Sequence, residues 1–109
     1  MAKSDDRVKF FQEISALIIQ LESEHLEFMP TSFFRTRAEE AIFYAQGKSK
    51  TLNSKHTEWL AIDLVLIKFG VLFWKEDPAY KKAGDLWKSM GHTWGGDWES
   101  LGDIYHFEF

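Results

Sequence analysis

Cysteine is absent from this chain of 109 residues. The protein therefore has no disulfide, no thiolate metal ligand and no cysteine nucleophile, and any bound metal must be held by His, Asp or Glu. Long apolar runs are absent as well, because no segment reaches the roughly 18 residues that suggest a membrane span. The first residues also lack the apolar segment of a signal peptide. We therefore expect a protein that is made in the cytoplasm and does not insert into a membrane.

An excess of positive charge is also missing. Thirteen Lys and Arg stand against 17 Asp and Glu, which gives a formal net charge of -4. Nucleic-acid-binding domains carry a basic patch or stripe, so we expect no nucleic-acid partner. The chain is instead rich in apolar residues, with 45% hydrophobic and 17% aromatic side chains. This composition supports a packed core and excludes a disordered chain.

Hydrophobic spacing and capping signals predict both helices and strands, without the repeat of a βαβ fold. A capping box at Thr36–Glu39 marks the start of one helix, and Pro78 suits the first position of another. The expected helices are residues 5–24, 36–47 and 77–91; the expected strands are 26–34, 59–67, 71–74 and 105–109; and 48–55 and 92–102 are expected loops. We predict an α+β fold: a single small domain over residues 1–109, with a mainly antiparallel sheet and about three helices.

Burial is predicted most clearly for two of these segments. The segment 59–67 is apolar on both faces, as a covered central strand would be, whereas Pro30 suggests an edge position for the strand around it. In the first helix, the apolar residues that recur at three- and four-residue steps are expected to face the core: Val8, Phe11, Ile14, Leu17, Ile18 and Leu21.

Asp63 is a carboxylate in the middle of an apolar run. A buried carboxylate is costly unless it is paired or binds a metal. His56 lies seven residues before it, and Asp103 and His106 lie three residues apart near the C-terminus. If the last strand lies beside the central strand, two imidazoles and one carboxylate face one point. Three such ligands with an open position for water form the ligand set of a catalytic zinc site.

Asp103 is left over in this arrangement and could serve as a general base beside the metal. The residues by themselves leave other interpretations open. Asp63 could pair with a Lys or an Arg, and Asp103 could be a turn residue after Gly102. Lone histidines such as His25 and His92 are more often surface or core residues than metal ligands.

The order of these residues resembles a known peptidase family. The pattern Ser54-x-His56-x6-Asp63, followed by Asp103-x-x-His106, is similar to the signature of zinc D-Ala-D-Ala carboxypeptidases, which include the VanY-like peptidases, and of phage L-alanyl-D-glutamate endopeptidases. Three longer segments also resemble the family: TSFFRT (31–36), IFYAQGKSKTLNSKH (42–56) and LWKSMGHTWGGDWESLGDIYHFEF (86–109). The resemblance implies a Hedgehog/D,D-peptidase-like fold with a zinc site at the sheet.

The resemblance also implies roles for single residues. One Zn²⁺ per chain would be held by His56, Asp63 and His106, with Asp103 as the general base. Arg35 would be a catalytic and substrate-binding residue that holds a substrate carboxylate or the developing oxyanion, because Arg offers a planar, always-charged set of donors. The alternative for Arg35 is a solvated surface charge.

Ser54 would lie at the mouth of the site and hydrogen-bond to the substrate; its alternative is a plain loop serine. Three positions depart from the family pattern. Many members have Gly where this chain has Phe33, Gln where it has Glu40, and Gly or Arg where it has Trp59. None of these changes removes a ligand, but each could reshape the cleft and its specificity.

The function implied by the resemblance is that of a zinc metallopeptidase acting on peptidoglycan stem peptides. Asp at position 103 resembles the endolysin branch, so we expect an L-alanyl-D-glutamate endopeptidase whose partner is bacterial peptidoglycan. The alternatives are a D-Ala-D-Ala carboxypeptidase and a non-catalytic module that binds wall peptides. We expect a monomer without a separate cell-wall-binding domain. Lacking a signal peptide, it would reach the wall after release through a holin or by delivery in a virion.

Overall fold

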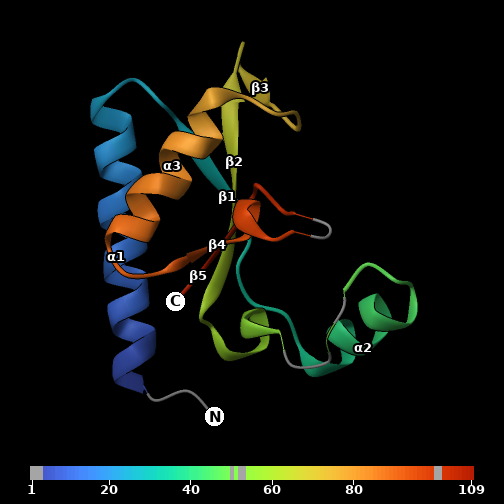
Figure 1. Cartoon of the computed structure of the whole chain (residues 1–109). Coiled ribbons are helices and arrows are strands. Elements are labelled where there is room, and N and C mark those ends of the chain that lie inside the picture. Colours follow the sequence, from blue (N-terminus) through green and yellow to red (C-terminus); the bar gives the residue numbers. More distant parts are fainter. Residues whose placement is uncertain (1–3, 50, 52–53, 100–101) are drawn as a thin grey trace.

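The structure is a computed structural model that describes residues 4–49, 51, 54–99 and 102–109. An antiparallel sheet lies at its centre, with strands in the order β1-β2-β5-β4 and with β3 paired to β2 (Figure 1). The strands are β1 (Phe28–Ser32), β2 (Ala61–Lys68), β3 (Val71–Leu72), β4 (Thr93–Trp94) and β5 (His106–Glu108). The helices are α1 (Ser4–Ser23), α2 (Arg37–Ala45) and α3 (Pro78–Ser89), with short 3₁₀ turns η1 (Lys55–Glu58) and η2 (Gly95–Asp97). The predicted α+β fold is confirmed.

The central strand is β2, as its apolar sequence predicts. It pairs with β1 along one edge and with β5 along the other. Side chains alternate between the two faces of a strand, so Ile62, Leu64 and Leu66 enter the core while Asp63 points to the opposite face. β1 lies at the edge of the sheet, and its register shifts between Pro30 and Ser32. Proline is tolerated there because an edge strand does not need every N–H for the ladder.

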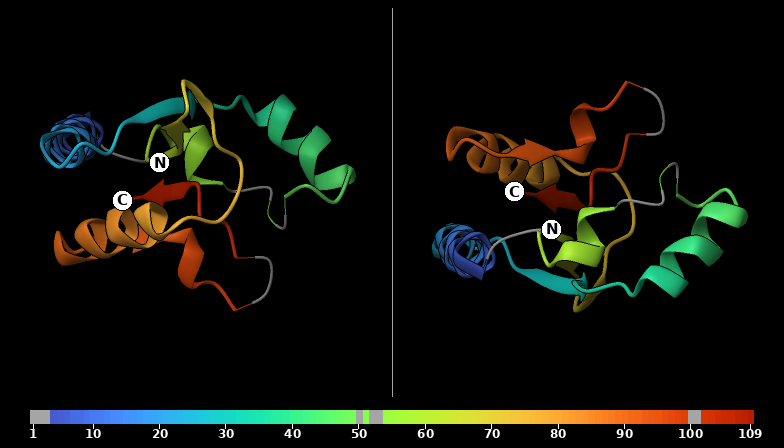
Figure 2. Two further views of the ribbon diagram at one scale, coloured as in Figure 1. Left: turned by 90° about the horizontal axis from the view of Figure 1, so that it is seen from above. Right: turned by 90° about the horizontal axis from the view of Figure 1, so that it is seen from below.

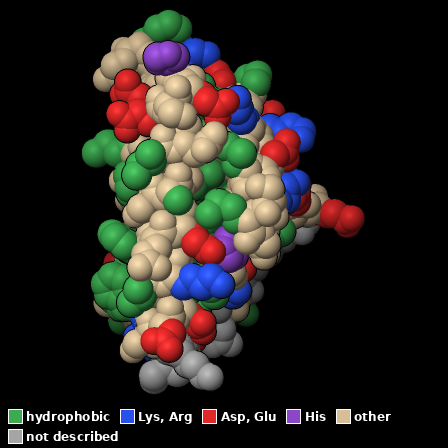
Figure 3. Space-filling model, turned by 90° about the vertical axis from the view of Figure 1, so that its left-hand side faces the viewer, with side chains coloured by type: hydrophobic (Ala, Val, Ile, Leu, Met, Phe, Trp, Pro, Cys, Tyr) green, Lys and Arg blue, Asp and Glu red, His purple; other side chains and the backbone are tan. Residues whose placement is uncertain are grey.

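Helices α1 and α3 cover one face of the sheet, and α2 stands on the other side of the molecule (Figures 1 and 2). The outer surface on the side of α1 and α3 mixes separate groups of hydrophobic side chains with charged ones (Figure 3). Helices α1 and α3 each contribute one apolar stripe to the core between them and the sheet. The core consists mainly of Phe10, Ile14, Leu17, Leu21, Phe28, Leu60, Ile62, Leu64, Leu66, Tyr80, Ala83, Trp87, Trp94 and Phe107.

The predicted stripe of α1 is correct at its centre and wrong at its start. Phe10 is fully buried, whereas Val8 and Phe11 are 57% and 59% exposed. The buried residues of this helix follow steps of four, three and four from Phe10, and positions 8 and 11 lie on the flank of that stripe. Phe11 instead stacks on the ring of Phe33, with centroids 6.5 Å apart.

Helix α2 begins with the predicted capping box. The Thr36 side chain accepts a hydrogen bond from the N–H of Glu39, and the Glu39 carboxylate accepts one from the N–H of Thr36. Gly47 follows the helix with a φ of 73°, a conformation that glycine adopts without steric cost. The expected loop 48–55 lies partly outside the described residues, because positions 50, 52 and 53 are not among them.

The segment 92–102 contains two short elements, β4 and η2, where only a loop was expected; positions 100 and 101 lie outside the described residues. A two-residue strand is too short to show the alternation from which strands are predicted. Trp94 of β4 packs closely on α3, because a Cβ at Gly84 would come within 2.1 Å of its ring. Its indole nitrogen donates to the Ile104 carbonyl at 2.9 Å. None of the helices that the structure describes is long and apolar enough to cross a membrane.

Candidate functional site

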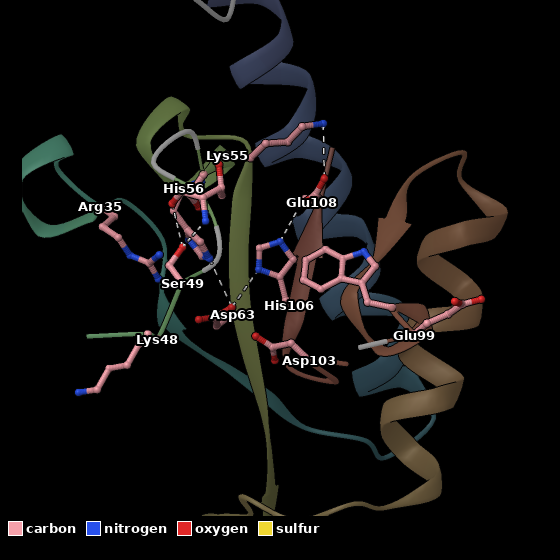
Figure 4. A pocket seen from close by; sticks show the side chains of 14 residues that line it. Arg35, Lys48, Ser49, Lys55, His56, Asp63, Glu99, Asp103, His106 and Glu108 are labelled. Atoms are coloured by element: carbon pink, nitrogen blue, oxygen red, sulfur yellow. Dashed lines mark hydrogen bonds and ion pairs between the residues drawn. The ribbon is translucent and has the colours of Figure 1, made fainter. Parts of the chain in front are cut away.

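Asp63 and His106 meet because their strands pair. They are direct partners in the antiparallel register of β2 and β5. Side chains opposite each other in such a pair point to the same face and lie about 5 Å apart. The neighbouring residues Ile62 and Phe107 point to the core instead. Because side chains alternate between the two faces of β2 and β5, one carboxylate and one imidazole lie on the face of the sheet away from α1 and α3 (Figure 4).

His56 reaches the same point from the turn η1. The Ser54 hydroxyl caps this turn by accepting a hydrogen bond from the N–H of His56 at 3.2 Å. The turn ends at Trp59, whose φ of 63° reverses the chain into β2. A positive φ is unfavourable for a residue with a Cβ, but the indole of Trp59 stacks on Phe34 with ring centroids 4.2 Å apart. His56 is thereby buried beside Asp63, with 2% of its surface exposed.

Each imidazole has one nitrogen on a protein acceptor and the other directed at Asp63. The Nδ1 of His56 lies 3.0 Å from the Phe33 carbonyl oxygen, which can only accept, so this nitrogen carries the hydrogen. The Nε2 of His106 lies 2.8 Å from a carboxylate oxygen of Glu108. The other nitrogens, Nε2 of His56 and Nδ1 of His106, each lie 3.5 Å from Oδ1 of Asp63. These three ligand atoms lie within 4.8 Å of one another.

This group fits a zinc ion. Oδ1 of Asp63 is buried and has no hydrogen-bond donor among the described residues, although buried polar atoms are normally satisfied. Two imidazole nitrogens and one carboxylate oxygen are donors that zinc takes in catalytic sites. A hydrogen-bond acceptor on the far nitrogen of each imidazole is also the usual support of a zinc ligand. His56, Asp63 and His106 could therefore hold the metal.

Asp63 and His106 each shift the pKa of the other. Burial by itself raises the pKa of Asp63, but its contacts with His106 and His56 outweigh this and lower that pKa to about 2. Burial lowers the pKa of His106, but the carboxylates of Asp63 and Glu108 outweigh this and raise that pKa to about 9. Without a metal, His106 is therefore protonated at neutral pH, and its positive charge compensates the carboxylate of Asp63.

Asp103 lines the same cleft, and its pKa is shifted in the direction opposite to that of Asp63. One of its carboxylate oxygens accepts a hydrogen bond from the N–H of Tyr105 at 3.0 Å, and its own N–H donates to the Gly95 carbonyl. A Cβ at Gly95 would meet the Asp103 carbonyl at 2.6 Å, so only glycine permits this close approach. Burial and the nearby charge of Asp63 raise the pKa of Asp103. A raised pKa suits a group that must accept and release a proton near neutral pH.

Arg35 lines this cleft rather than standing free at the surface. Its Nη1 lies 2.7 Å from Oε2 of Glu40, and its guanidinium lies over the Phe43 ring at 4.7 Å. The cleft has a volume of about 750 Å³, and Arg35 points into it from the side opposite Asp103 (Figure 4). Ser54 also lines the cleft, where its hydroxyl is engaged by the His56 backbone.

Sequence reasoning missed Glu108, and it named Glu40 only as a departure from the family pattern, without its burial or its partner. Glu108 orients His106, and the two-residue spacing that places both on one face of β5 could have revealed it. Glu40 is fully buried against Arg35, although it follows a capping box on a largely exposed helix. Trp98 of the Gly-rich segment also lines the cleft, with its ring 4.9 Å from that of His106. His25 and His92 are not part of the cation-binding group, and His92 pairs with Glu13.

The fold and the cleft define an α+β domain with a His–Asp–His group on an antiparallel sheet that could hold a cation. The family model described as D-alanyl-D-alanine carboxypeptidase matches residues 47–109, more than half of the chain. The chain belongs to this family of M15 peptidases.

Two relatives in sequence carry more specific names. The chain is 32% identical over 91 residues to the L-alanyl-D-glutamate peptidase of Listeria phage A118, which covers 81% of this chain and 32% of that protein. It is 29% identical, over an alignment of 115 positions, to the peptidoglycan L-alanyl-D-glutamate endopeptidase CwlK of Bacillus subtilis strain 168, covering 89% of this chain and 69% of that protein. The chain thus spans about a third of the length of the phage relative.

A solved structure is similar as well. The L-Ala D-Glu endopeptidase ChiX of Serratia marcescens superposes with a TM-score of 0.66 and 28% sequence identity. The match covers 86% of this chain and 76% of that chain. The predicted family and fold are both confirmed by these likenesses.

Proposed function

We propose that this protein is a zinc metallopeptidase that hydrolyses peptidoglycan stem peptides, with L-alanyl-D-glutamate endopeptidase activity. The observation that carries the proposal is the convergence of His56, Asp63 and His106 at a cleft that also holds Asp103. The names of the phage, Bacillus and Serratia relatives support this choice of bond. A D-Ala-D-Ala carboxypeptidase is the second candidate, since the matching family model carries that description.

In this proposal His56, Asp63 and His106 hold one zinc ion. When bound, zinc would polarise the scissile carbonyl and increase the acidity of a water molecule beside it. Asp103 accepts the proton of the attacking water and returns it to the nitrogen of the leaving group, for which its raised pKa is suited. Arg35 donates hydrogen bonds to the carbonyl oxygen as negative charge develops on it. Ser54, at the wall of the cleft, contacts the substrate.

The partner in this proposal is bacterial peptidoglycan, and one chain carries one complete site. The protein acts on the wall, which it reaches from the cytoplasm through a holin or by delivery in a virion. No second subunit is needed, because all five proposed catalytic and metal-binding residues line a single cleft of one chain.

The test is digestion of purified peptidoglycan by the zinc-loaded protein, followed by mass spectrometry of the products. New L-Ala carboxyl and D-Glu amino termini are expected. Asp103→Asn should lower the rate by roughly 10²- to 10⁴-fold, the usual contribution of a general base, while zinc content stays at one per chain. Release of free D-Ala would instead assign the carboxypeptidase reaction. Zinc binding without any product would indicate a module that binds wall peptides.

A further inference from the structure

Glu40 is a buried carboxylate in the wall of the cleft. It is fully buried, and no other residue of α2 is. Its Oε2 accepts a hydrogen bond from Arg35 at 2.7 Å. Its Oε1 is buried and has no hydrogen-bond partner in the described part of the chain. A carboxylate is kept out of water in this way only where a positive charge compensates it, and here that charge is Arg35.

Arg35 is held in one orientation by three contacts. Its backbone N–H donates to the His56 carbonyl at 3.2 Å, which ties it to the turn that carries a candidate zinc ligand. Its guanidinium makes a cation–π contact with the Phe43 ring, with Cζ 4.7 Å from the ring centroid. Glu40 holds one terminal nitrogen, and 17% of the Arg35 side chain remains exposed toward the cleft. The remaining N–H groups of Arg35 are thus positioned rather than mobile.

The Arg35–Glu40 pair also determines the electrostatic potential at this wall of the cleft. Arg35 and Glu40 together are neutral, so the pair offers hydrogen-bond donors with little net positive potential. A neutral peptide carbonyl can accept hydrogen bonds from such donors, whereas a free carboxylate would be repelled by the nearby charge of Glu40. Among the described residues, two other cations line the cleft. Lys55 is engaged by the Phe109 carbonyl and Glu108, and Lys48 is exposed, where solvent screens its charge.

We propose that Glu40 is a positioning and specificity-determining residue. It holds Arg35 in place and neutralises it, so that the cleft accepts an internal peptide carbonyl in preference to a free C-terminal carboxylate. The inference rests on the proposed peptidase function, because it assigns Arg35 to the substrate. It also gives a physical reason for an endopeptidase rather than a carboxypeptidase specificity at this site.

Two substitutions separate the parts of this proposal. Glu40→Gln has nearly the same volume and keeps an oxygen that can accept a hydrogen bond from Arg35. It therefore removes the negative charge but keeps the contact that positions Arg35. Glu40→Ala removes both. Glu39→Gln is the matched control, because it removes the same charge one residue away at an exposed position and still allows a capping box.

The first measurement is binding, which does not depend on turnover. N-acetyl-D-alanine and N-acetyl-D-alanine amide differ only in their C-terminal group, a charged carboxylate or a neutral amide. Each is titrated into the zinc-loaded protein, and binding is followed by NMR. In Glu40→Gln the affinity for the carboxylate ligand should rise roughly tenfold relative to the amide, the size expected for one uncompensated charge in a partly buried site. Glu39→Gln should match the wild type. An unchanged ratio, or no binding of the carboxylate by Glu40→Gln, would overturn the proposal.

The second measurement is hydrolysis of two peptides that contain the same L-Ala-D-Glu bond, one amidated and one with a free carboxylate directly after D-Glu. Glu40→Gln should shift the ratio of kcat/KM toward the free carboxylate, and Glu40→Ala should lower kcat for both peptides. If Glu40→Gln lowers kcat/KM equally for both peptides, Glu40 has only a structural role and does not determine specificity. If the wild type cleaves neither peptide, the proposed function fails, and the binding titration still decides the role of Glu40.

Discussion

At the scale of single residues, the site depends on how each imidazole is oriented. Asp63 and His106 face each other through strand pairing, but the nitrogen that each histidine presents is chosen by its second partner. For His106 that partner is Glu108, whose carboxylate accepts from Nε2. The pKa of Glu108 is lowered, since its contact with His106 outweighs the effect of burial. Glu108 is therefore charged at neutral pH and determines that Nδ1 of His106, not Nε2, faces Asp63.

Replacement of Glu108 tests this orientation. Glu108→Ala should weaken zinc binding by roughly 10- to 100-fold, the usual effect of losing the hydrogen-bond acceptor of a metal-bound histidine. Affinity is measured by competition with a chromogenic chelator. Glu99→Ala is the control, because Glu99 lines the same cleft but is not one of the three candidate ligands or their hydrogen-bond partners. Equal affinities of the two variants would contradict the role of Glu108.

At the scale of secondary structure, the turn η1 ends in a strained backbone conformation. Trp59 ends it in a left-handed conformation and is 41% exposed. The conformation costs roughly 1–2 kcal/mol for a residue with a Cβ. The stacking of Trp59 on Phe34 contributes roughly 0.5–1.5 kcal/mol in the opposite direction. The two effects nearly cancel, which explains how a tryptophan occupies a position suited to glycine.

Trp59→Gly should therefore change the free energy of unfolding by less than about 1.5 kcal/mol, since relief of strain offsets the lost stacking. Trp87→Ala is the contrast, because Trp87 is fully buried and its indole donates to the Glu108 carbonyl at 2.9 Å. It should cost roughly 3–5 kcal/mol. Urea unfolding measures both values. A loss in Trp59→Gly as large as in Trp87→Ala would show that the turn is not strained.

Element boundaries were predictable where a local signal exists. The capping box of α2, the proline at the start of α3 and the apolar run of β2 each act within a few residues, and each prediction was confirmed. The buried face of α1 was predicted imperfectly, because Phe10 and Phe11 are both apolar and only the position of the sheet selects between them. β4 could not be predicted, since its two residues are ordered by pairing with β5.

At the scale of the whole molecule, the proposed zinc ion would compete with protons for His106, and this competition should change the stability of the fold. The pKa of His106 in the folded, metal-free protein is about 9, above its ordinary value of 6.5. Its contribution to stability is complete below pH 6.5 and is lost as the pH rises toward 9. The pKa of Asp63 is about 2, below its ordinary 3.8, so its contribution is present above pH 3.8 and is lost as the pH falls toward 2.

The metal-free protein should thus lose thermal stability as the pH rises from 6.5 to 9. Excess zinc should raise Tm, and the increase should grow over the same range, because the metal binds deprotonated His106. Scanning calorimetry with chelator or with zinc measures both trends. A Tm of the chelated protein that stays flat between pH 6.5 and 9 would contradict the coupling of His106 to Asp63.

The sequence by itself determined the periodicities, the caps and the identity of the residues that gather at the cleft. Its pattern sufficed to predict the family, the α+β class and the central position of β2, because these depend on residue types and short spacings. The tertiary structure decided what depends on contacts between distant segments. The register of β2 and β5 joins Asp63 to His106. The burial of Glu40 beside Arg35 arises only where α2 folds back on the cleft, and no short-range signal encodes that approach.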